Sequence, residues 1–116
     1  MNKIYSMLGL ASKAGKLFSG EDVVRNAIRY NKIKLLIISQ DASENTKKRF
    51  VNAAEYYKVP MKIWGDKEQL GSSIGKSNRS VVGIGDENFT NSIVTLLNAE
   101  NPITPIGEKS GGELNE

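Results

Sequence analysis

The 116-residue sequence contains no cysteine and no histidine. Without cysteine the chain can form neither a disulfide nor a thiolate metal site, which fits a reducing cytoplasm. Without histidine it lacks the usual general base and the commonest zinc ligand, which disfavours triad enzymes and metallohydrolases. Long apolar runs are also missing, because no stretch approaches the roughly 18 residues that would span a bilayer. We therefore expect a cytoplasmic protein with no membrane segment, no metal, no cofactor and no catalytic site.

Positive charge exceeds negative charge, but unevenly along the chain. Sixteen Lys and Arg against 13 Asp and Glu give a formal net charge of +3. The segment after Asn98 holds four glutamates and one lysine, so subtracting it leaves 15 basic and nine acidic residues, a net charge of +6. A basic body favours a polyanionic partner, although a charge excess that only improves solubility explains it about equally well.

Apolar periodicity and turn residues predict alternating helices and strands along one domain. The expected helices span about 3–14, 20–30, 43–57, 66–75 and 87–98, and the expected strands span about 16–18, 35–39, 61–64 and 80–84. The run LLIIS at 35–39 is typical of a strand buried on both faces. Such alternation with short loops predicts three layers, with helices on both faces of a mixed or parallel sheet.

Two pairs of polar residues have the spacing of a capping box, in which side chains close the first turn of a helix. They are Asp41 with Glu44, and Asp66 with Gln69. Carboxylates at such positions could instead bind magnesium or serve acid-base chemistry. Capping explains them more simply, because helix starts favour acidic residues in any case.

The stretch KLFSGEDVVRNAIR, from Lys16 to Arg29, places a glycine before a helix with two different faces. The side expected to pack on a sheet holds Val23, Val24, Ala27 and Ile28; the outward side holds Asp22, Arg25, Asn26 and Arg29. Gly20 leaves the first helix amides uncovered, so an anion or a base edge could approach there. The alternative is an ordinary amphipathic helix with a solvated polar face.

The segment GSSIGKS at 71–77 is close to a P-loop but departs from it twice. It has three residues between its glycines where a P-loop has four, and a helix precedes it where a P-loop needs a strand. Nucleotide hydrolysis is therefore disfavoured. The two glycines are expected to let a helix pack closely and stop, which leaves Lys76 and Arg79 on an exposed loop.

An ordered set of motifs resembles the kink-turn RNA-binding ribosomal proteins of the L7Ae/L30e family, and most of all its small bacterial YlxQ-type members. The motifs are LGLASKAGKLFSGED at 8–22, IKLLIISQDAS at 33–43, YYKVP at 56–60 and LGSSIGK at 70–76. The resemblance covers roughly residues 2–98. It implies an RNA-binding domain over 1–98, folded as a three-layer α/β/α sandwich with a central four-stranded mixed sheet. The segment 99–116 lacks periodicity and is expected to be a disordered polar tail.

The resemblance also implies an RNA surface built from two pieces. The glycine and first turns of the second helix would enter a widened groove beside tandem G·A pairs, and the loop before the last strand would cover a flipped-out nucleotide. The implied RNA-binding residues are Lys16, Gly20, Glu21, Asp22, Arg25, Asn26, Arg29, Gly75, Lys76 and Arg79. The sequence departs from the family at Glu21, where threonine is usual, at Asp22, where asparagine is frequent, at Val23, which replaces glutamate or glutamine, and at Asn26, which replaces lysine.

Two functions of different classes follow. The first is a noncatalytic, monomeric RNA-binding module that docks on structured RNA with a kink or internal loop. The RNA would be ribosomal or regulatory, so the ribosome is an expected partner and DNA is not. The second is a protein-interaction adaptor on the same fold, whose RNA face is eroded at Val23 and Asn26.

Overall fold

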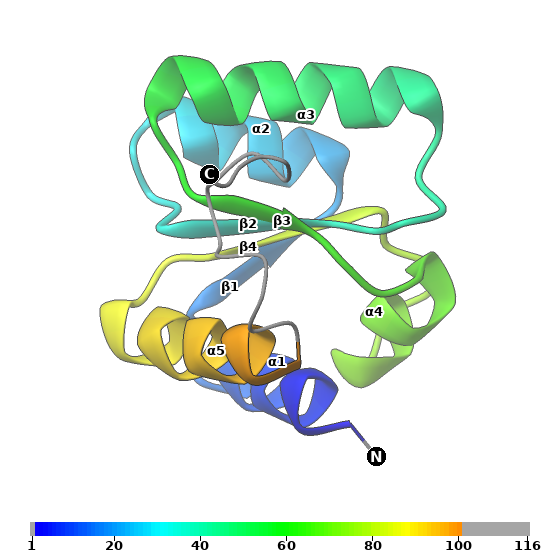
Figure 1. Ribbon diagram of the computed structural model, residues 1–116, viewed down its shortest axis with the longest axis vertical. Coiled ribbons are helices and arrows are strands. Elements are labelled where there is room, and N and C mark those ends of the chain that lie inside the picture. Colours follow the sequence, from blue (N-terminus) through cyan, green and yellow to red (C-terminus); the bar gives the residue numbers. More distant parts are fainter. Residues whose placement is uncertain (1, 101–116) are drawn as a thin grey trace.

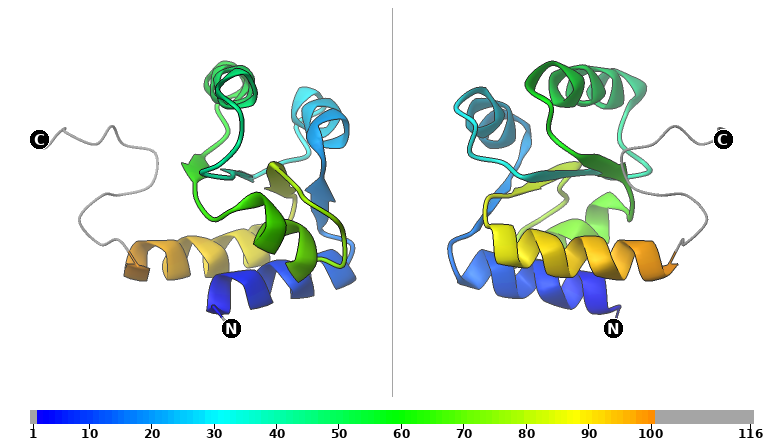
Figure 2. Two further views of the ribbon diagram at one scale, coloured as in Figure 1. Left: turned by 90° about the vertical axis from the view of Figure 1, so that its right-hand side faces the viewer. Right: turned by 60° about the vertical axis from the view of Figure 1, so that its left-hand side comes forward.

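The computed structural model describes residues 2–100, which form three layers (Figure 1). The elements are α1 (Lys3–Lys13), β1 (Leu17–Ser19), α2 (Glu21–Arg29), β2 (Leu35–Ile38), α3 (Glu44–Tyr57), β3 (Met61–Ile63), α4 (Lys67–Ser73), β4 (Val81–Ile84) and α5 (Glu87–Glu100). α2 and α3 cover one face of the sheet, and α1, α4 and α5 cover the other (Figures 1 and 2). The predicted three-layer α/β/α sandwich is confirmed.

The four strands form a mixed sheet in the order β1-β4-β2-β3. β4 pairs antiparallel with β1 and with β2, whereas β2 and β3 are parallel. β2 and β4 are the two central strands, and every residue in them is buried. The prediction that the LLII run would lie in a strand covered on both faces is therefore confirmed.

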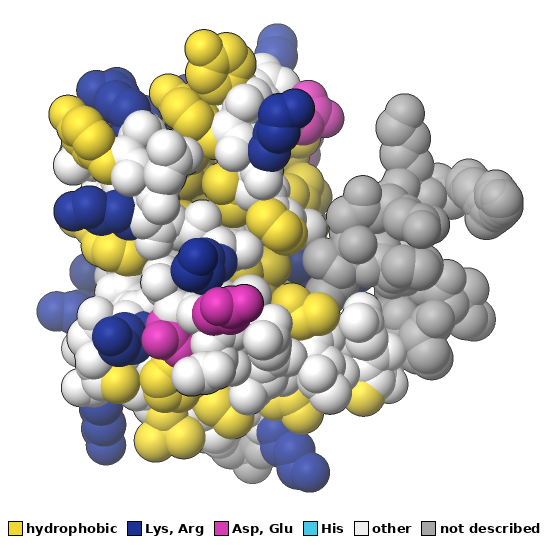
Figure 3. Space-filling view, turned by 90° about the vertical axis from the view of Figure 1, so that its left-hand side faces the viewer, with side chains coloured by type: hydrophobic (Ala, Val, Ile, Leu, Met, Phe, Trp, Pro, Cys, Tyr) yellow, Lys and Arg dark blue, Asp and Glu magenta, His cyan; other side chains and the backbone are white. Residues whose placement is uncertain are grey.

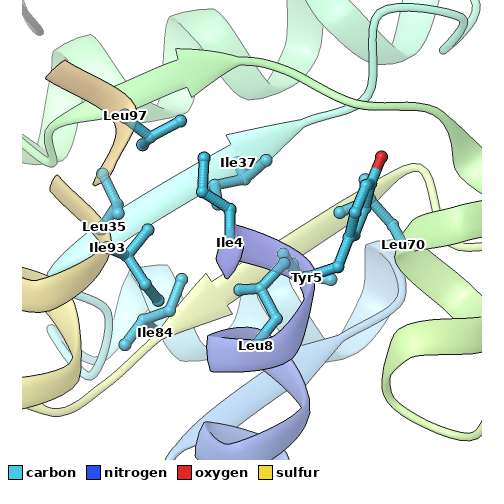
Figure 4. Packing of buried hydrophobic residues seen from close by; sticks show 10 residues of the cluster. Ile4, Tyr5, Leu8, Leu35, Ile37, Leu70, Ile84, Ile93 and Leu97 are labelled. Atoms are coloured by element: carbon cyan, nitrogen blue, oxygen red, sulfur yellow. The ribbon is translucent and has the colours of Figure 1, made fainter. Parts of the chain in front are cut away.

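Alternation along β2 divides the core into two clusters. Leu35 and Ile37 face α1, α4 and α5, whereas Leu36 and Ile38 face α2 and α3. Figure 4 shows the first cluster, with Ile4, Tyr5, Leu8, Leu35, Ile37, Leu70, Ile84, Ile93 and Leu97. α2 is thus seated on a closely packed sheet, which fixes the position of its exposed face.

One of the two predicted capping boxes is wrong. Asp66 caps α4 and accepts from the Gln69 amide at 2.8 Å, as predicted, although the Asp66 amide donates to the Tyr5 hydroxyl and not to the Gln69 side chain. The cap of α3, however, is Ser43, whose hydroxyl accepts from the Thr46 amide at 3.1 Å. Asp41 instead accepts from the Lys67 amide at 3.0 Å, because the β2–α3 connection runs past the start of α4.

α5 continues to Glu100, two residues beyond the predicted helix end at 98. Glu100 accepts hydrogen bonds from Asn2 Nδ2 at 2.7 Å and from Trp64 Nε1 at 2.9 Å. These two donors hold the pKa of Glu100 below its ordinary value of 4.5. Positions 99 and 100 are therefore helical, whereas the sequence predicted that the disordered tail begins at residue 99. The rest of that predicted tail, residues 101–116, lies outside the described residues.

Candidate nucleic-acid interface

The antiparallel pairing of β1 with β4 brings the two predicted pieces of the surface together. Ser19, the last residue of β1, lies opposite Val82 in β4. The amide of Gly20 then donates to the carbonyl of Val81 at 3.2 Å. The start of α2 and the chain that enters β4 therefore lie side by side (Figure 2, left). Sequence reasoning predicted each piece, and the sheet topology explains why they are adjacent.

Arg79 joins the two pieces through its guanidinium group. Its Nε donates to Ser19 Oγ at 3.3 Å, and its Nη1 donates to the carbonyls of Ser77 at 3.3 Å and Asn78 at 3.0 Å. A methyl group placed on Gly20 would lie 4.0 Å from Arg79 Nε. Arg79 is thus a clamp between the loop and β1 as well as a positive charge beside Gly20.

No side chain caps the N-terminus of α2 with a hydrogen bond. Its N-cap, Gly20, adopts φ 93° and ψ 149°, a conformation that is costly for residues with a Cβ. Asn2, Ser43 and Asp66 cap α1, α3 and α4 with side-chain oxygens, whereas glycine cannot. The first amides of α2 are therefore available to an external acceptor, and the helix dipole favours a negatively charged one.

Both carboxylates in the first turn of α2 are paired with arginines. Asp22 Oδ1 lies 2.8 Å from Arg25 Nη2 on the same helix. Glu21 Oε1 lies 2.6 Å from Arg49 Nη2 on α3, and Glu21 Oε2 accepts from Thr46 Oγ1 at 3.1 Å. The carboxylate of Glu21, which the resemblance placed near RNA, is thus held against α3.

The outward face of α2 differs from the predicted one at Val23. Val24, Ala27 and Ile28 are buried, as predicted, but Val23 is 52% exposed. At about 100° per residue, the three buried residues span roughly 100° of the helix circumference, and Val23 lies about 40° outside this arc, beyond Ala27. Val23 therefore shares the exposed surface of α2 with Asn26 and Arg29, which are exposed as predicted.

Close backbone packing fixes the loop after α4. Gly71 is buried, and a methyl group there would overlap the carbonyl oxygen of Ser77. Gly75 follows with φ 74°, which turns the chain out of the helix. The amide of Lys76 donates to the Gly71 carbonyl at 2.8 Å while its side chain is exposed. The close-packed glycine and the exposed Lys76 are as predicted, whereas Arg79 is half-buried because its side chain is held against Ser19.

Lys16 lies at the other end of β1 from Gly20. Four residue steps of extended chain separate them by roughly 13 Å. The carbonyl of Lys16 accepts from the Gly85 amide at 2.9 Å, which places it near the start of α5. Figure 3 shows this end of the molecule, where two neighbouring carboxylates lie beside Lys and Arg side chains. Among the predicted site residues, Lys16 is therefore separated from the start of α2, and so is Arg29, which lies at the opposite end of that helix.

Sequence reasoning missed Ser19 and Arg49, which contact predicted site residues. Arg49 is 28 positions from Glu21, and Ser19 is 60 positions from Arg79. Both contacts depend on how elements pack, so no local spacing could have indicated them. The one usable signal was the acidic start of α2 together with basic residues early in α3.

Neither a metal centre nor a membrane segment is found among residues 2–100. Nowhere in this part do three or more His, Cys, Asp or Glu side chains lie close enough to hold a metal ion. Each of its helices is too short or too polar to cross a bilayer.

The sequence profile of the ribosomal protein L7Ae/L30e/S12e/Gadd45 family matches residues 2–94, which include the whole sheet and both pieces of the surface. The chain belongs to this family. A curated relative in it, "RNA-binding protein YlxQ" of Bacillus subtilis (strain 168), is 44% identical over 93 residues, which are 80% of this chain and 93% of the relative. A protein of the same name from Enterococcus faecium is 38% identical over 95 residues, 82% of this chain and 91% of that one.

Two solved structures have the same L7Ae-family architecture. A Bacillus halodurans protein described as having unknown function is 36% identical, with a TM-score of 0.80 over 84% of this chain and 99% of that one. The 15.5 kDa RNA-binding protein of Giardia lamblia is 19% identical, with a TM-score of 0.71 over 88% of each chain. At that identity the second likeness concerns the fold alone.

Proposed function

We propose that this L7Ae-family protein is a noncatalytic, monomeric RNA-binding module of the cytoplasm that docks on kinked or internally looped RNA. The observation that carries the proposal is the contact between the uncapped start of α2 and the loop clamped by Arg79. Backbone amides and a guanidinium group converge there, and both are common ligands of nucleic-acid phosphates. The names of the two curated relatives support RNA as the polyanion.

Phosphate contacts would dominate this surface. Lys76 and Arg79 would hold the backbone on one side of Gly20, and Arg25 and Arg29 would hold it along α2. Asn26 is the exposed amide best placed on α2 to reach base edges or sugar hydroxyls. Because few groups on the surface can read bases directly, RNA shape would decide recognition.

One observation favours the protein-interaction adaptor as a second candidate. Val23 is 52% exposed, and Tyr30, the C-cap of α2 seven positions later, is 63% exposed. Positions i and i+7 lie on the same side of a helix, so the exposed side of α2 carries apolar as well as basic groups. A protein partner could use the same surface that RNA would use.

The test compares a kinked RNA that contains tandem G·A pairs with a straight duplex of equal length, by gel shift at several salt concentrations. Wild type should prefer the kinked RNA, and the preference should disappear in Gly20→Ala. The matched control is Gly15→Ala, because Gly15 also has a positive φ, 73°, but lies before the opposite end of β1 with nothing within 4 Å of its added methyl. Circular dichroism confirms that both variants fold.

Equal and weak binding of both RNAs by the wild type would contradict the proposal and favour the adaptor. If Gly15→Ala also lost the preference for kinked RNA, backbone strain at either glycine would be enough to remove that preference. The role assigned to the start of α2 would then be wrong.

A further inference from the structure

The salt bridge between Glu21 and Arg49 lies where a negative charge should be harmful to RNA binding. Glu21 is the first residue of α2 and follows Gly20, the N-cap residue that has no capping side chain. A free carboxylate at this position would compete with phosphate for the open amides and would repel it. In the structure, contacts from α3 hold the Glu21 carboxylate against that helix.

Both oxygens of the Glu21 carboxylate are engaged. Oε1 lies 2.6 Å from Arg49 Nη2, and Oε2 accepts from Thr46 Oγ1 at 3.1 Å. Thr46 is only 5% exposed, and its hydroxyl also accepts from Ser43 Oγ at 3.0 Å. The hydroxyl end of this network is thus fixed by the packing of α3, while the Arg49 end is 42% exposed.

We propose that Arg49 is a positioning residue for RNA binding, which holds Glu21 against α3 and so keeps the first amides of α2 open to phosphate. This inference rests on the proposed function. Arg49 acts through Glu21 and not through a contact of its own with RNA. Loss of Arg49 releases one oxygen of the carboxylate and leaves a negative charge uncompensated beside the phosphate.

A double-mutant cycle separates this role from a direct contact. The variants are Arg49→Gln, Glu21→Gln and the pair together, each measured by gel shift on the kinked RNA. Lys48→Gln is the matched control, because Lys48 is exposed on the same helix and forms no ion pair within residues 2–100. It removes the same formal charge from α3 without releasing Glu21.

At low salt Arg49→Gln should weaken binding about fivefold, the effect of one nearby like charge in water, whereas Lys48→Gln should weaken it less than about twofold. In the Glu21→Gln background, the further change Arg49→Gln should alter affinity by less than about twofold, since no carboxylate is left to release. The defect of Arg49→Gln should also shrink as salt screens the repulsion. Structural damage would be neither repaired by Glu21→Gln nor screened by salt.

The inference is overturned if Arg49→Gln binds as well as Lys48→Gln, or if it is equally weak with and without Glu21. The second result would assign Arg49 a direct contact or a purely structural role. These failures differ from failure of the proposed function, in which the wild type itself does not distinguish kinked from straight RNA; that result would overturn both. Circular dichroism melts establish that every variant is folded at the assay temperature.

Discussion

Replacing Gly71 by alanine should destabilise the protein and displace the loop that carries Lys76. In the interior of a helix, alanine is normally better than glycine by about 1 kcal/mol. At this position the added methyl would overlap the carbonyl oxygen of Ser77 and come 3.1 Å from the amide nitrogen of Asn78. Both are backbone atoms, so no side-chain rotation relieves the overlap.

The magnitude follows from the cost of overpacking. Inserting a methyl into a close-packed contact typically costs about 1 to 3 kcal/mol, which offsets or exceeds the gain in helix propensity. If the overlap is not tolerated, the whole loop after α4 must move away from the helix. A net loss of about 1 kcal/mol would lower the melting temperature by roughly 4 to 8 °C in a domain of this size. Ser72→Ala, at the exposed neighbouring position of α4, is the control and should leave stability almost unchanged.

Thermal melts by circular dichroism measure the first effect, and gel shifts on kinked RNA measure the second. Gly71→Ala should bind kinked RNA more weakly even at temperatures where it is fully folded, because Lys76 and Arg79 are moved relative to Gly20. A melting temperature equal to or above that of the wild type would refute the reasoning. It would mean that helix propensity outweighs the packing of this loop on α4.

Two further predictions concern other parts of the chain. Glu100→Gln should lower the melting temperature at neutral pH, and its difference from the wild type should disappear as the pH falls below 4.5. Hydrogen bonds from Asn2 and Trp64 depress the pKa of Glu100 in the folded state, so the stability that they confer is present above the unfolded-state pKa and is lost as the pH falls through the folded-state pKa. Thermal melts across this pH range measure the difference, and a difference that does not change with pH would contradict the prediction. Asn26→Lys should strengthen binding to kinked RNA by about 1 to 3 kcal/mol if the new lysine reaches a guanine edge, and it should have little effect on binding to a straight duplex. An unchanged affinity for kinked RNA in the gel shift would exclude the outer side of α2 as an RNA site.

The order of helices and strands could be predicted because its signals are local. The LLII strand and the helix expected at about 43–57 each follow from periodicity within one segment, and the structure has them as β2 and α3. Strand order and direction could not be obtained in that way, because pairing joins residues far apart in sequence. The contact of Ser19 with Arg79 depends on the antiparallel pairing of β1 with β4. Periodicity alone left a parallel sheet possible.

The two capping predictions show how a local rule can fail. Asp41 and Asp66 have the same spacing to a partner three residues later, yet only Asp66 caps a helix. Ser43 lies two residues after Asp41 and becomes the cap of α3, and Asp41 is left to accept from an amide at the start of α4. Which of two candidate oxygens becomes the cap depends on where the neighbouring helix begins, and the sequence pattern does not contain that information.

The residues that the resemblance gives as departures from the family act on one physical property of the surface. The Val23 side chain can neither donate nor accept a hydrogen bond, and the carboxylates of Glu21 and Asp22 are paired with Arg49 and Arg25. None of the first three positions of α2 therefore offers an unpaired polar side chain to a base. What is left at the start of the helix is the backbone amides, with Arg79 beside them. Amides and guanidinium groups recognise where phosphates lie and not which bases they join. If RNA binds here, its specificity should therefore come from a backbone bent so that phosphates reach both the helix start and the loop. Its affinity should then fall with salt more steeply than base readout alone would allow.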